Sequence, residues 1–270
     1  IHVLDPHAPY SPPEKYARKF MPPGAAPTPG TMDMFKKFVW RNPPATVGQA
    51  AYLSGLYDGE VAAADEGFGR FLKWLEENDL ARTIVLFTSD HGEEFYEHRG
   101  LGHGGTLYEE LVHVPLIAHF PGVPSGERAD FISLMDIMPA LLEYIGEPLP
   151  DSLLKQEMHD GLRSLAGRRE IYCHQKLDKV EKQCIIIWPF KLIHNINRRN
   201  QWGEIVREYE FYNLEDDPRE QTGVLRANKI ARKTLMEALK RFDGPAISRP
   251  TGQPQKISPE LLKRLESLGY

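Results

Sequence analysis

Residues 83–121, TIVLFTSDHGEEFYEHRGLGHGGTLYEELVHVPLIAHFP, hold the densest chemistry of the chain and indicate its fold class. The β-branched and aromatic run at 83–87 predicts a buried strand, and the polar residues Ser89, Asp90 and His91 follow where such a strand gives way to a loop. In open α/β sheets, ligands bind beyond the carboxyl ends of the strands. Asp90 and His91 are therefore placed to hold a metal ion.

A second imidazole, His103, lies in the glycine-rich loop GHGG at 102–105, before the next apolar run at 114–120. Loops at neighbouring strand ends can face a common pocket, whereas the same residues on a helix would be held at one spacing. Residues 1–5, IHVLD, predict a core strand that ends at Pro6-His7. We expect His7, Asp90, His91 and His103 to converge at one edge of the sheet.

The composition narrows the class of protein. With 41% hydrophobic and 26% charged residues, the 270-residue chain is globular and long enough for a main domain with a smaller appendage. The formal net charge of -5 and the scattered basic residues argue against nucleic-acid binding, which needs clustered Lys and Arg. No run approaches the ~20 apolar residues of a transmembrane helix, and no charged-then-apolar leader opens the sequence.

The apolar spacing at 47–78 predicts one long amphipathic helix that packs on a sheet. This helix connects the strands predicted at 1–5 and 83–87, and a crossover of this size is typical of parallel strands. The fold class is therefore α/β, with a mainly parallel sheet flanked by helices. Residues 131–145 predict a further helix, which Gly146 and Pro148 end.

Residues 8–46 carry too many prolines for a helix or a central strand. We expect a long covering loop over the strand ends, with a short helix at 13–20. Because residues 1–5 begin without an element that could pair with them or cover them, we also expect that a preceding segment belongs to the protein.

Beyond residue 150 the pattern changes, so we expect residues 1–150 to form the main domain and residues 151–270 a small α+β subdomain. Short apolar runs joined by hairpin-length connections predict an antiparallel sheet; they lie at 171–174, 184–187, 191–196 and 209–214. A basic helix is predicted at 221–242 and a closing helix at 258–269.

The two cysteines, Cys173 and Cys184, flank a polar loop and can face each other across a hairpin. A disulfide and a pair of small apolar core residues both fit this pattern. We favour the core residues, because sequence spacing alone does not establish the Cα separation that a disulfide needs.

Six motifs, in order, resemble those of the sulfatase family in the alkaline-phosphatase-like superfamily. Residues 5–10, DPHAPY, resemble its PHxPY element, and residues 88–93, TSDHGE, resemble its SDHGE metal motif. The other four lie at 97–100, 102–114, 134–140 and 211–221. The chain thus resembles about the C-terminal two-thirds of a sulfatase, and residues 1–150 resemble the C-terminal portion of its catalytic domain.

The resemblance implies a sulfate ester hydrolase that uses a divalent metal. Asp90 and His91 would be two ligands of the cation, which polarises the sulfate oxygens, and His7 and His103 would contact the transferred group. Ca²⁺ is the metal that the resemblance favours, with Mn²⁺ or Zn²⁺ as alternatives because His91 adds a nitrogen ligand. The substrate would be a sulfated small molecule or glycan, and the location periplasmic or secreted.

The family's nucleophile is a formylglycine matured from the Cys of CxPxR, or Ser or Thr in phosphate-cleaving relatives. Neither Cys173 nor Cys184 is followed by Pro-x-Arg. We therefore expect the nucleophile in a segment outside these residues, and no activity from the 270-residue chain alone. A phosphonate or phosphodiester hydrolase, a phosphoglycerol transferase and a non-catalytic scaffold subunit remain alternatives. Glu93, Glu94 and His98 are weaker site candidates.

Overall fold

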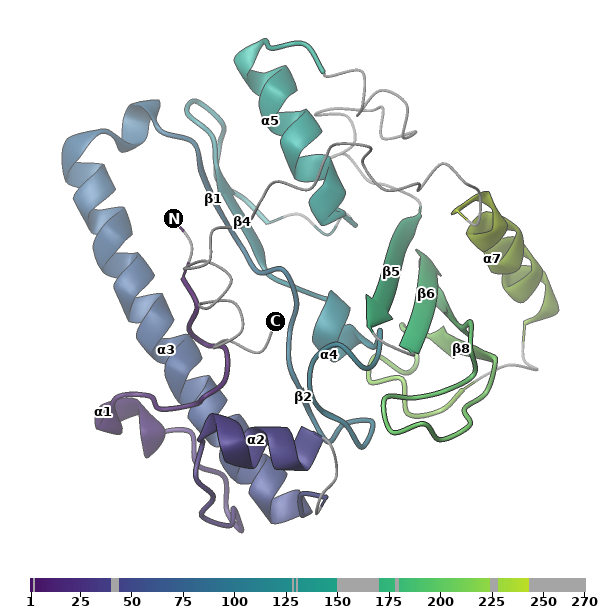
Figure 1. The fold of residues 1–270 in the computed structure, drawn as a ribbon. Helices are drawn as coiled ribbons and strands as arrows, with labels where there is room; N and C mark the ends of the chain where they lie inside the picture. Colours follow the sequence, from purple (N-terminus) through teal and green to yellow (C-terminus); the bar gives the residue numbers. More distant parts are fainter. Residues whose placement is uncertain are drawn as a thin grey trace, which may run out of the picture.

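In the computed structural model, an N-terminal part of helices and short strands lies beside a C-terminal sheet covered by a helix (Figure 1). The structure describes residues 1, 3–39, 44–127, 129, 131–149, 170–177, 180–223 and 228–242. Residues 150–169, where the predicted subdomain begins, and the closing helix predicted at 258–269 lie outside these residues. No helix in the described part has both the length and the apolar character that crossing a membrane requires.

Helix α3, Val47–Asn78, is the long amphipathic helix that the sequence predicts. It begins at a capping box: the Gln49 N–H donates to the Thr46 hydroxyl at 3.2 Å, and the Thr46 N–H donates to the Gln49 side chain at 2.9 Å. Leu53 and Leu56 on this helix are buried in the N-terminal core. The helix borders one side of the N-terminal part (Figure 1).

Two helices lie in the proline-rich segment 8–46: α1, Glu14–Ala17, and α2, Met32–Val39. The first is the short helix that the sequence predicts, whereas α2 corrects the prediction of a loop. The prolines flank residues 32–39 rather than enter them, and Phe35 and Phe38 are buried in the core beside α3.

The strand predicted at residues 1–5 is not formed. Ile1 and Val3 are exposed, at 103% and 59%, and none of the strands in the described part pairs with this stretch. A strand needs a neighbour to accept and donate its backbone hydrogen bonds. The chain turns here instead, and the His7 N–H donates to the Leu4 carbonyl at 2.8 Å.

Strands β1, Val85–Thr88, and β4, Leu116–His119, form at the two apolar runs that flank the site motif. They pair antiparallel, with Val85 opposite His119 and Thr88 opposite Leu116. The parallel pairing predicted from the crossover joined the runs at 1–5 and 83–87, and it is not formed because residues 1–5 make no strand. Every strand pair in the described residues is antiparallel. The physical reason is the connection at 89–115, which turns back and brings the second run alongside the first.

That connection contains a short hairpin, in which β2, Glu94–Phe95, pairs antiparallel with β3, Leu101–Gly102. Helix α4, Glu109–Val112, follows the hairpin. The Gly92 N–H donates to the Leu111 carbonyl at 2.9 Å, which ties the loop after β1 to the end of α4.

Two 3₁₀ turns and one helix complete the N-terminal part. The turn Leu80–Arg82 joins α3 to β1, and the turn Leu134–Asp136 leads into helix α5, Ile137–Ile145. The helix ends at Gly146, whose φ of 77° is left-handed and favours glycine. The helix predicted at 131–145 is thus present, with a later start.

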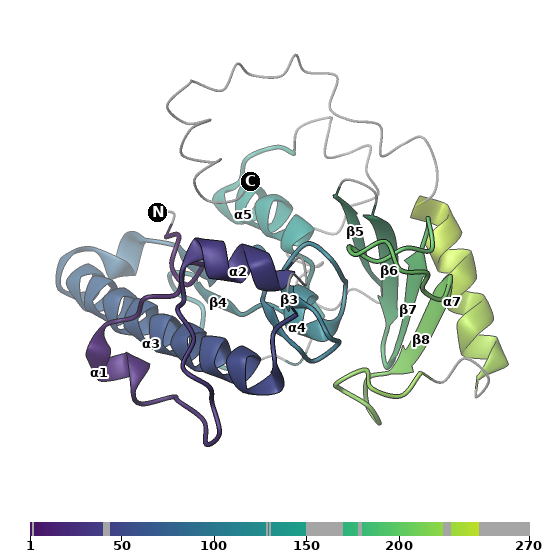
Figure 2. The same ribbon diagram turned by 60° about the horizontal axis from the view of Figure 1, so that its bottom comes forward.

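The C-terminal sheet is antiparallel, as the sequence predicts, and its strands follow one another in chain order. They are β5, Ile171–Leu177; β6, Val180–Ile187; β7, Phe190–Asn195; and β8, Tyr209–Asn213. Helix α7, Lys229–Phe242, covers one face of this sheet (Figure 2) and begins later than the predicted residue 221.

Side chains of β7 alternate between the two faces of the sheet. Leu192 packs with Leu235 of α7, whereas Ile193 packs with Leu107, just before α4. The sheet therefore joins α7 to the N-terminal part. Cys173 and Cys184 stand directly opposite each other on β5 and β6, and both are free thiols in the core, as the sequence favours.

Candidate functional site

Three of the four predicted site residues bring their rings together. The ring centroids of His7 and His103 lie 5.2 Å apart, and those of His91 and His103 lie 4.0 Å apart. His7 comes from the turn near the start of the chain, His91 from the loop after β1, and His103 from the residue after β3. Three separate segments thus meet, as expected, although His7 comes from a turn and not from the end of a strand at 1–5.

Asp90 lies beside this cluster, with its side chain 77% exposed. Its Oδ2 atom lies 3.9 Å from His91 Nε2, and its Oδ1 atom accepts the His91 backbone N–H at 3.1 Å. The carboxylate and the Nε2 nitrogen can therefore approach one ion from adjacent positions in the chain.

Backbone carbonyl groups orient two of the rings. His7 Nδ1 lies 2.6 Å from the Ala8 carbonyl oxygen, and His91 Nδ1 lies 2.8 Å from the Gly92 carbonyl oxygen. Because a carbonyl only accepts hydrogen bonds, Nδ1 carries the hydrogen in both rings. Nε2 is then the nitrogen with which each ring acts on a ligand.

The third ring, His103, is oriented by a carboxylate. Its Nδ1 atom lies 2.7 Å from Glu93 Oε1, and the Glu93 side chain is 4% exposed. Sequence reasoning ranked Glu93 among the weaker candidates, because its position in the SDHGE motif says nothing of its partner. Glu93 immediately precedes β2 and His103 immediately follows β3, so the antiparallel pairing of these strands identifies Glu93 as the partner.

Asp90 and His91 fit part of a ligand set for a divalent cation. Metal-bound histidines usually donate their other ring N–H to a carbonyl or carboxylate, and His91 has this arrangement with Gly92. A carboxylate suits Ca²⁺, and a carboxylate with an imidazole suits Mn²⁺ or Zn²⁺. A second group, His7, Glu93 and His103, has ligand atoms within 4.8 Å of one another.

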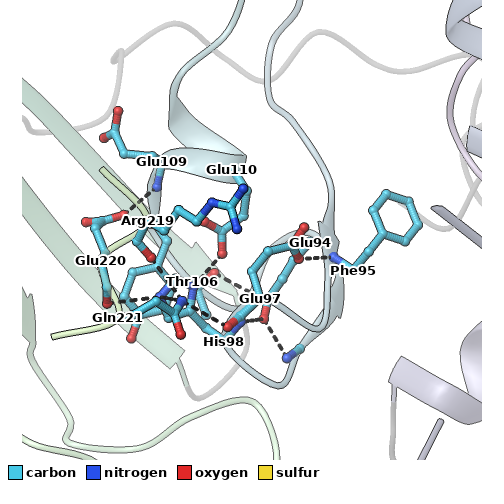
Figure 3. Close-up of polar contacts among 12 residues, drawn as sticks. Glu94, Phe95, Glu97, His98, Thr106, Glu109, Glu110, Arg219, Glu220 and Gln221 are labelled. Carbon is cyan, nitrogen blue, oxygen red and sulfur yellow. Dashed lines mark hydrogen bonds and ion pairs between the residues drawn. The ribbon is translucent and has the colours of Figure 1, made fainter. Parts of the chain in front are cut away.

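A further ionisable group, Glu94, His98 and Glu110, lies beside the hairpin (Figure 3). Glu94 Oε1 accepts the backbone N–H of His98 at 3.1 Å and that of Gly100 at 2.5 Å. His98 Nδ1 lies 2.6 Å from Glu110 Oε1, and Nε2 lies 3.2 Å from the Glu220 carbonyl oxygen. Since hydrogen bonds already engage these atoms, the group serves to hold the hairpin in place.

Burial shapes the electrostatics of this group. It raises the pKa of Glu94 to about 7, against the lowering effect of the Gly100 and His98 N–H groups. For His98, burial acts to lower the pKa, but the hydrogen bond to Glu110 and its charge outweigh it, so the pKa rises. Both ring nitrogens of His98 face acceptor oxygens, an arrangement that suits the imidazolium.

The C-terminal sheet supports the site segment at α4. Lys191 Nζ, on β7, lies 2.9 Å from Glu109 Oε1 and 2.9 Å from Glu220 Oε1, and its side chain is 0% exposed. The Glu109 backbone N–H donates to Glu220 Oε2 at 2.6 Å. This network attaches the start of α4 to the sheet.

The same sheet contacts the loop that carries His103. The Gly104 carbonyl accepts a hydrogen bond from the Gln175 side chain, and a Cβ atom at Gly105 would collide with the Gln201 side chain. Gly104 has a φ of 85°, which favours glycine. The glycines of this loop thus allow the C-terminal sheet to approach closely.

Two family models match the chain. The model described as Sulfatase matches residues 1–147, and the model described as N-sulphoglucosamine sulphohydrolase, C-terminal, matches residues 97–243. An N-acetylglucosamine-6-O-sulfatase of Bacteroides thetaiotaomicron is 31% identical over 198 residues, which cover 68% of this chain and 34% of that protein. The chain spans about a third of the length of the curated relatives it matches, 34% and 33% for two of them.

Solved structures share the fold. A protein in complex with its substrate D-glucosamine-2-N,6-O-disulfate matches with a TM-score of 0.55 and 21% identity, over 83% of this chain and 51% of that chain. A 2-O GAG sulfatase matches with a TM-score of 0.61 and 17% identity, over 81% of this chain and 49% of that chain. The likeness confirms the predicted α/β architecture with its small C-terminal antiparallel sheet.

Proposed function

The chain belongs to the sulfatase family, and on that basis we propose that it is part of a divalent-metal-dependent hydrolase of sulfate esters. The observation that carries this proposal is the cluster of His7, His91 and His103. Each ring directs Nδ1 to an oxygen of the protein, and we assign the contact with the ligand to Nε2. The exposed Asp90 carboxylate beside them adds the charge that a cation needs.

We assign the cation to Asp90 and His91. When bound, it supplies Lewis-acid polarisation of the sulfate oxygens. Asp90 contributes negative charge, and the Gly92 carbonyl keeps His91 Nε2 in its ligand form. Ca²⁺ is the metal that we favour, because carboxylate oxygen is its usual ligand; Mn²⁺ or Zn²⁺ are the alternatives, because His91 offers nitrogen.

We assign His7 and His103 to the sulfate group. A protonated Nε2 donates a hydrogen bond to a sulfate oxygen and stabilises the charge that develops there, or it gives its proton to the leaving alcohol. The hydrogen bonds at Nδ1 hold both rings before the substrate arrives, so little reorganisation is needed during the reaction.

We place the formylglycine nucleophile in a segment outside these 270 residues. Neither Cys173 nor Cys184 is followed by Pro-x-Arg, and both lie in the C-terminal sheet. Residues 1–150 are then the C-terminal portion of the catalytic domain, and residues 151–270 a subdomain that supports it. A sulfated sugar is the substrate class that we favour, because one relative is named an N-acetylglucosamine-6-O-sulfatase and one matched structure holds a disulfated glucosamine.

The test compares the 270-residue chain with the protein made from its full coding sequence, on p-nitrophenyl sulfate, on N-acetylglucosamine 6-sulfate and on p-nitrophenyl phosphate. We expect the full protein to release sulfate and the chain alone to release none. Phosphate release without sulfate release would favour the phosphodiester or phosphonate hydrolase. No turnover of any substrate by a folded, metal-loaded full protein would favour a scaffold subunit.

A further inference from the structure

Glu93 is a buried acid that contacts one of the imidazole rings of the candidate site. Its side chain is 4% exposed, and Oε1 lies 2.7 Å from His103 Nδ1. Its second oxygen, Oε2, is buried and has no hydrogen-bond partner among the described residues. A buried carboxylate is costly to maintain unless its contacts compensate, so its hydrogen bond to an imidazole in the site is informative.

The pairing of β2 with β3 explains why these two residues meet. The register places Phe95 opposite Leu101 and Glu94 opposite Gly102. One step further along the same antiparallel ladder brings Glu93 opposite His103. The contact therefore follows from a local hairpin, and it does not require a distant part of the chain.

The backbone around His103 does not hold the ring by itself. Gly102 and Gly104 flank it, with φ values of 81° and 85°. Glycines lack the Cβ atom that restricts the backbone, so a loop of this kind can present a side chain in several directions. A side-chain anchor is needed to select one of them.

We propose that Glu93 is a positioning residue, which holds His103 with Nδ1–H toward the buried carboxylate and Nε2 toward the substrate. The inference rests on the proposed function, in which His103 contacts the sulfate group. A carboxylate only accepts hydrogen bonds, so it selects the Nδ1–H tautomer of the neutral ring, and it accepts the same hydrogen bond when Nε2 also carries a proton. The ring contacts of His103 with His7 and His91 do not select a tautomer, so the carboxylate is the group to which we assign that selection.

The first experiment reads the tautomer directly and does not depend on catalysis. The full protein is labelled with ¹⁵N-histidine, and long-range ¹H–¹⁵N correlation spectra are recorded at alkaline pH, where imidazoles are neutral; a His103→Gln spectrum assigns the signals. We expect Nδ1 of His103 to carry the hydrogen in the wild type. Glu93→Leu removes the acceptor, so it should shift His103 toward the Nε2–H form. Glu93→Gln keeps an amide oxygen that accommodates the Nδ1–H tautomer, so it should give a smaller shift.

Glu60→Gln is the matched control. Glu60 is also a buried carboxylate, at 5% exposure, with one oxygen that accepts the Ser11 N–H at 2.6 Å and a second oxygen without a partner in the described part of the chain. It lies on α3, and its substitution should leave the His103 signals unchanged. If the folded Glu93→Leu protein keeps the wild-type tautomer, or if the wild type already shows Nε2–H, the positioning role is wrong.

The second experiment measures the consequence for turnover. We expect Glu93→Gln to lower kcat for an aryl sulfate by roughly 10- to 100-fold, with KM little changed, because the substrate still binds but the ring no longer meets it in one orientation. An unchanged kcat would overturn the proposal. If the wild-type protein releases no sulfate while the tautomer shifts as expected, the proposed function fails and the positioning role stands.

Discussion

Lys191 Nζ lies 2.9 Å from Glu220 Oε1, and both side chains are 0% exposed. Burial acts to lower the pKa of Lys191, but the charges of Glu220 and Glu109 outweigh it, so the pKa rises. The pair joins β7 to the segment after β8, and through Glu109 it reaches the first residue of α4. The C-terminal sheet and the site segment are therefore connected by a charge that has no access to water.

Lys191→Met should destabilise the protein by about 3 to 5 kcal/mol, because it leaves Glu220 buried without its cation. The measurement is the free energy of unfolding from urea denaturation. Lys176→Met is the control, because the Lys176 side chain is 63% exposed in its pair with Glu181. That change should cost less than about 1 kcal/mol. Equal effects of the two substitutions would contradict the structural role of the buried pair.

Stability should fall as the pH rises through neutrality. The folded state raises the pKa of His98, so its stabilisation is present below the ordinary histidine value and is lost as the pH passes the raised one. Glu94 also binds its proton more tightly when folded, with a pKa of about 7 against an ordinary 4.5, so stability declines between these values. Both contributions have the same sign.

We therefore expect a lower Tm at about pH 8.5 than at about pH 6, measured by differential scanning calorimetry, and a flatter dependence in His98→Gln and in Glu94→Gln. His113→Gln is the control, because the His113 side chain is 79% exposed. Burial also raises the pKa of Glu60 to about 7, so part of the dependence should remain in both variants. A Tm that rises with pH, or a dependence as steep as that of the wild type in both variants, would contradict the assignment to this group.

Asp90→Asn should weaken cation binding by at least about tenfold while keeping the shape of the side chain, because it removes the negative charge next to His91. Isothermal titration of the metal-free full protein with Ca²⁺, and then with Mn²⁺, measures the change. Asp65→Asn, an exposed substitution on α3, is the control. Excess cation should partly restore activity to Asp90→Asn, and unchanged affinity would exclude Asp90 as a ligand.

His7→Ala and His103→Ala should impair turnover, whereas Asp90→Asn impairs cation binding. Both should keep the cation and lose kcat by roughly 10²- to 10⁴-fold, the usual range for a positioned acid or charge stabiliser. Steady-state kinetics with metal analysis of the same samples separates the two classes of variant. His174→Ala, on β5, should retain activity. Loss of metal together with activity in His103→Ala would indicate that His103 is a ligand.

Regular local patterns in the sequence were sufficient to predict the longest helix and the C-terminal sheet. The apolar spacing of residues 47–78 specified α3 to its ends, because a helix that packs on a core must repeat its apolar residues at helical spacing. The four short runs after residue 170 likewise predicted the antiparallel sheet of β5 to β8. Helix α2 was not predicted, because the prolines on both sides of this short amphipathic stretch indicated a loop.

The sequence by itself determined the α/β class, the C-terminal antiparallel sheet and the loops that carry His7, Asp90, His91 and His103, because periodicity and motif order are local properties of the chain. Only the tertiary structure decided that β1 and β4 pair antiparallel and that the ring centroid of His103 lies 5.2 Å from that of His7 and 4.0 Å from that of His91. It also decided that Glu93 is the partner of His103. Strand direction and side-chain partners depend on how the connecting loops turn in space, and neither apolar spacing nor motif order contains that information.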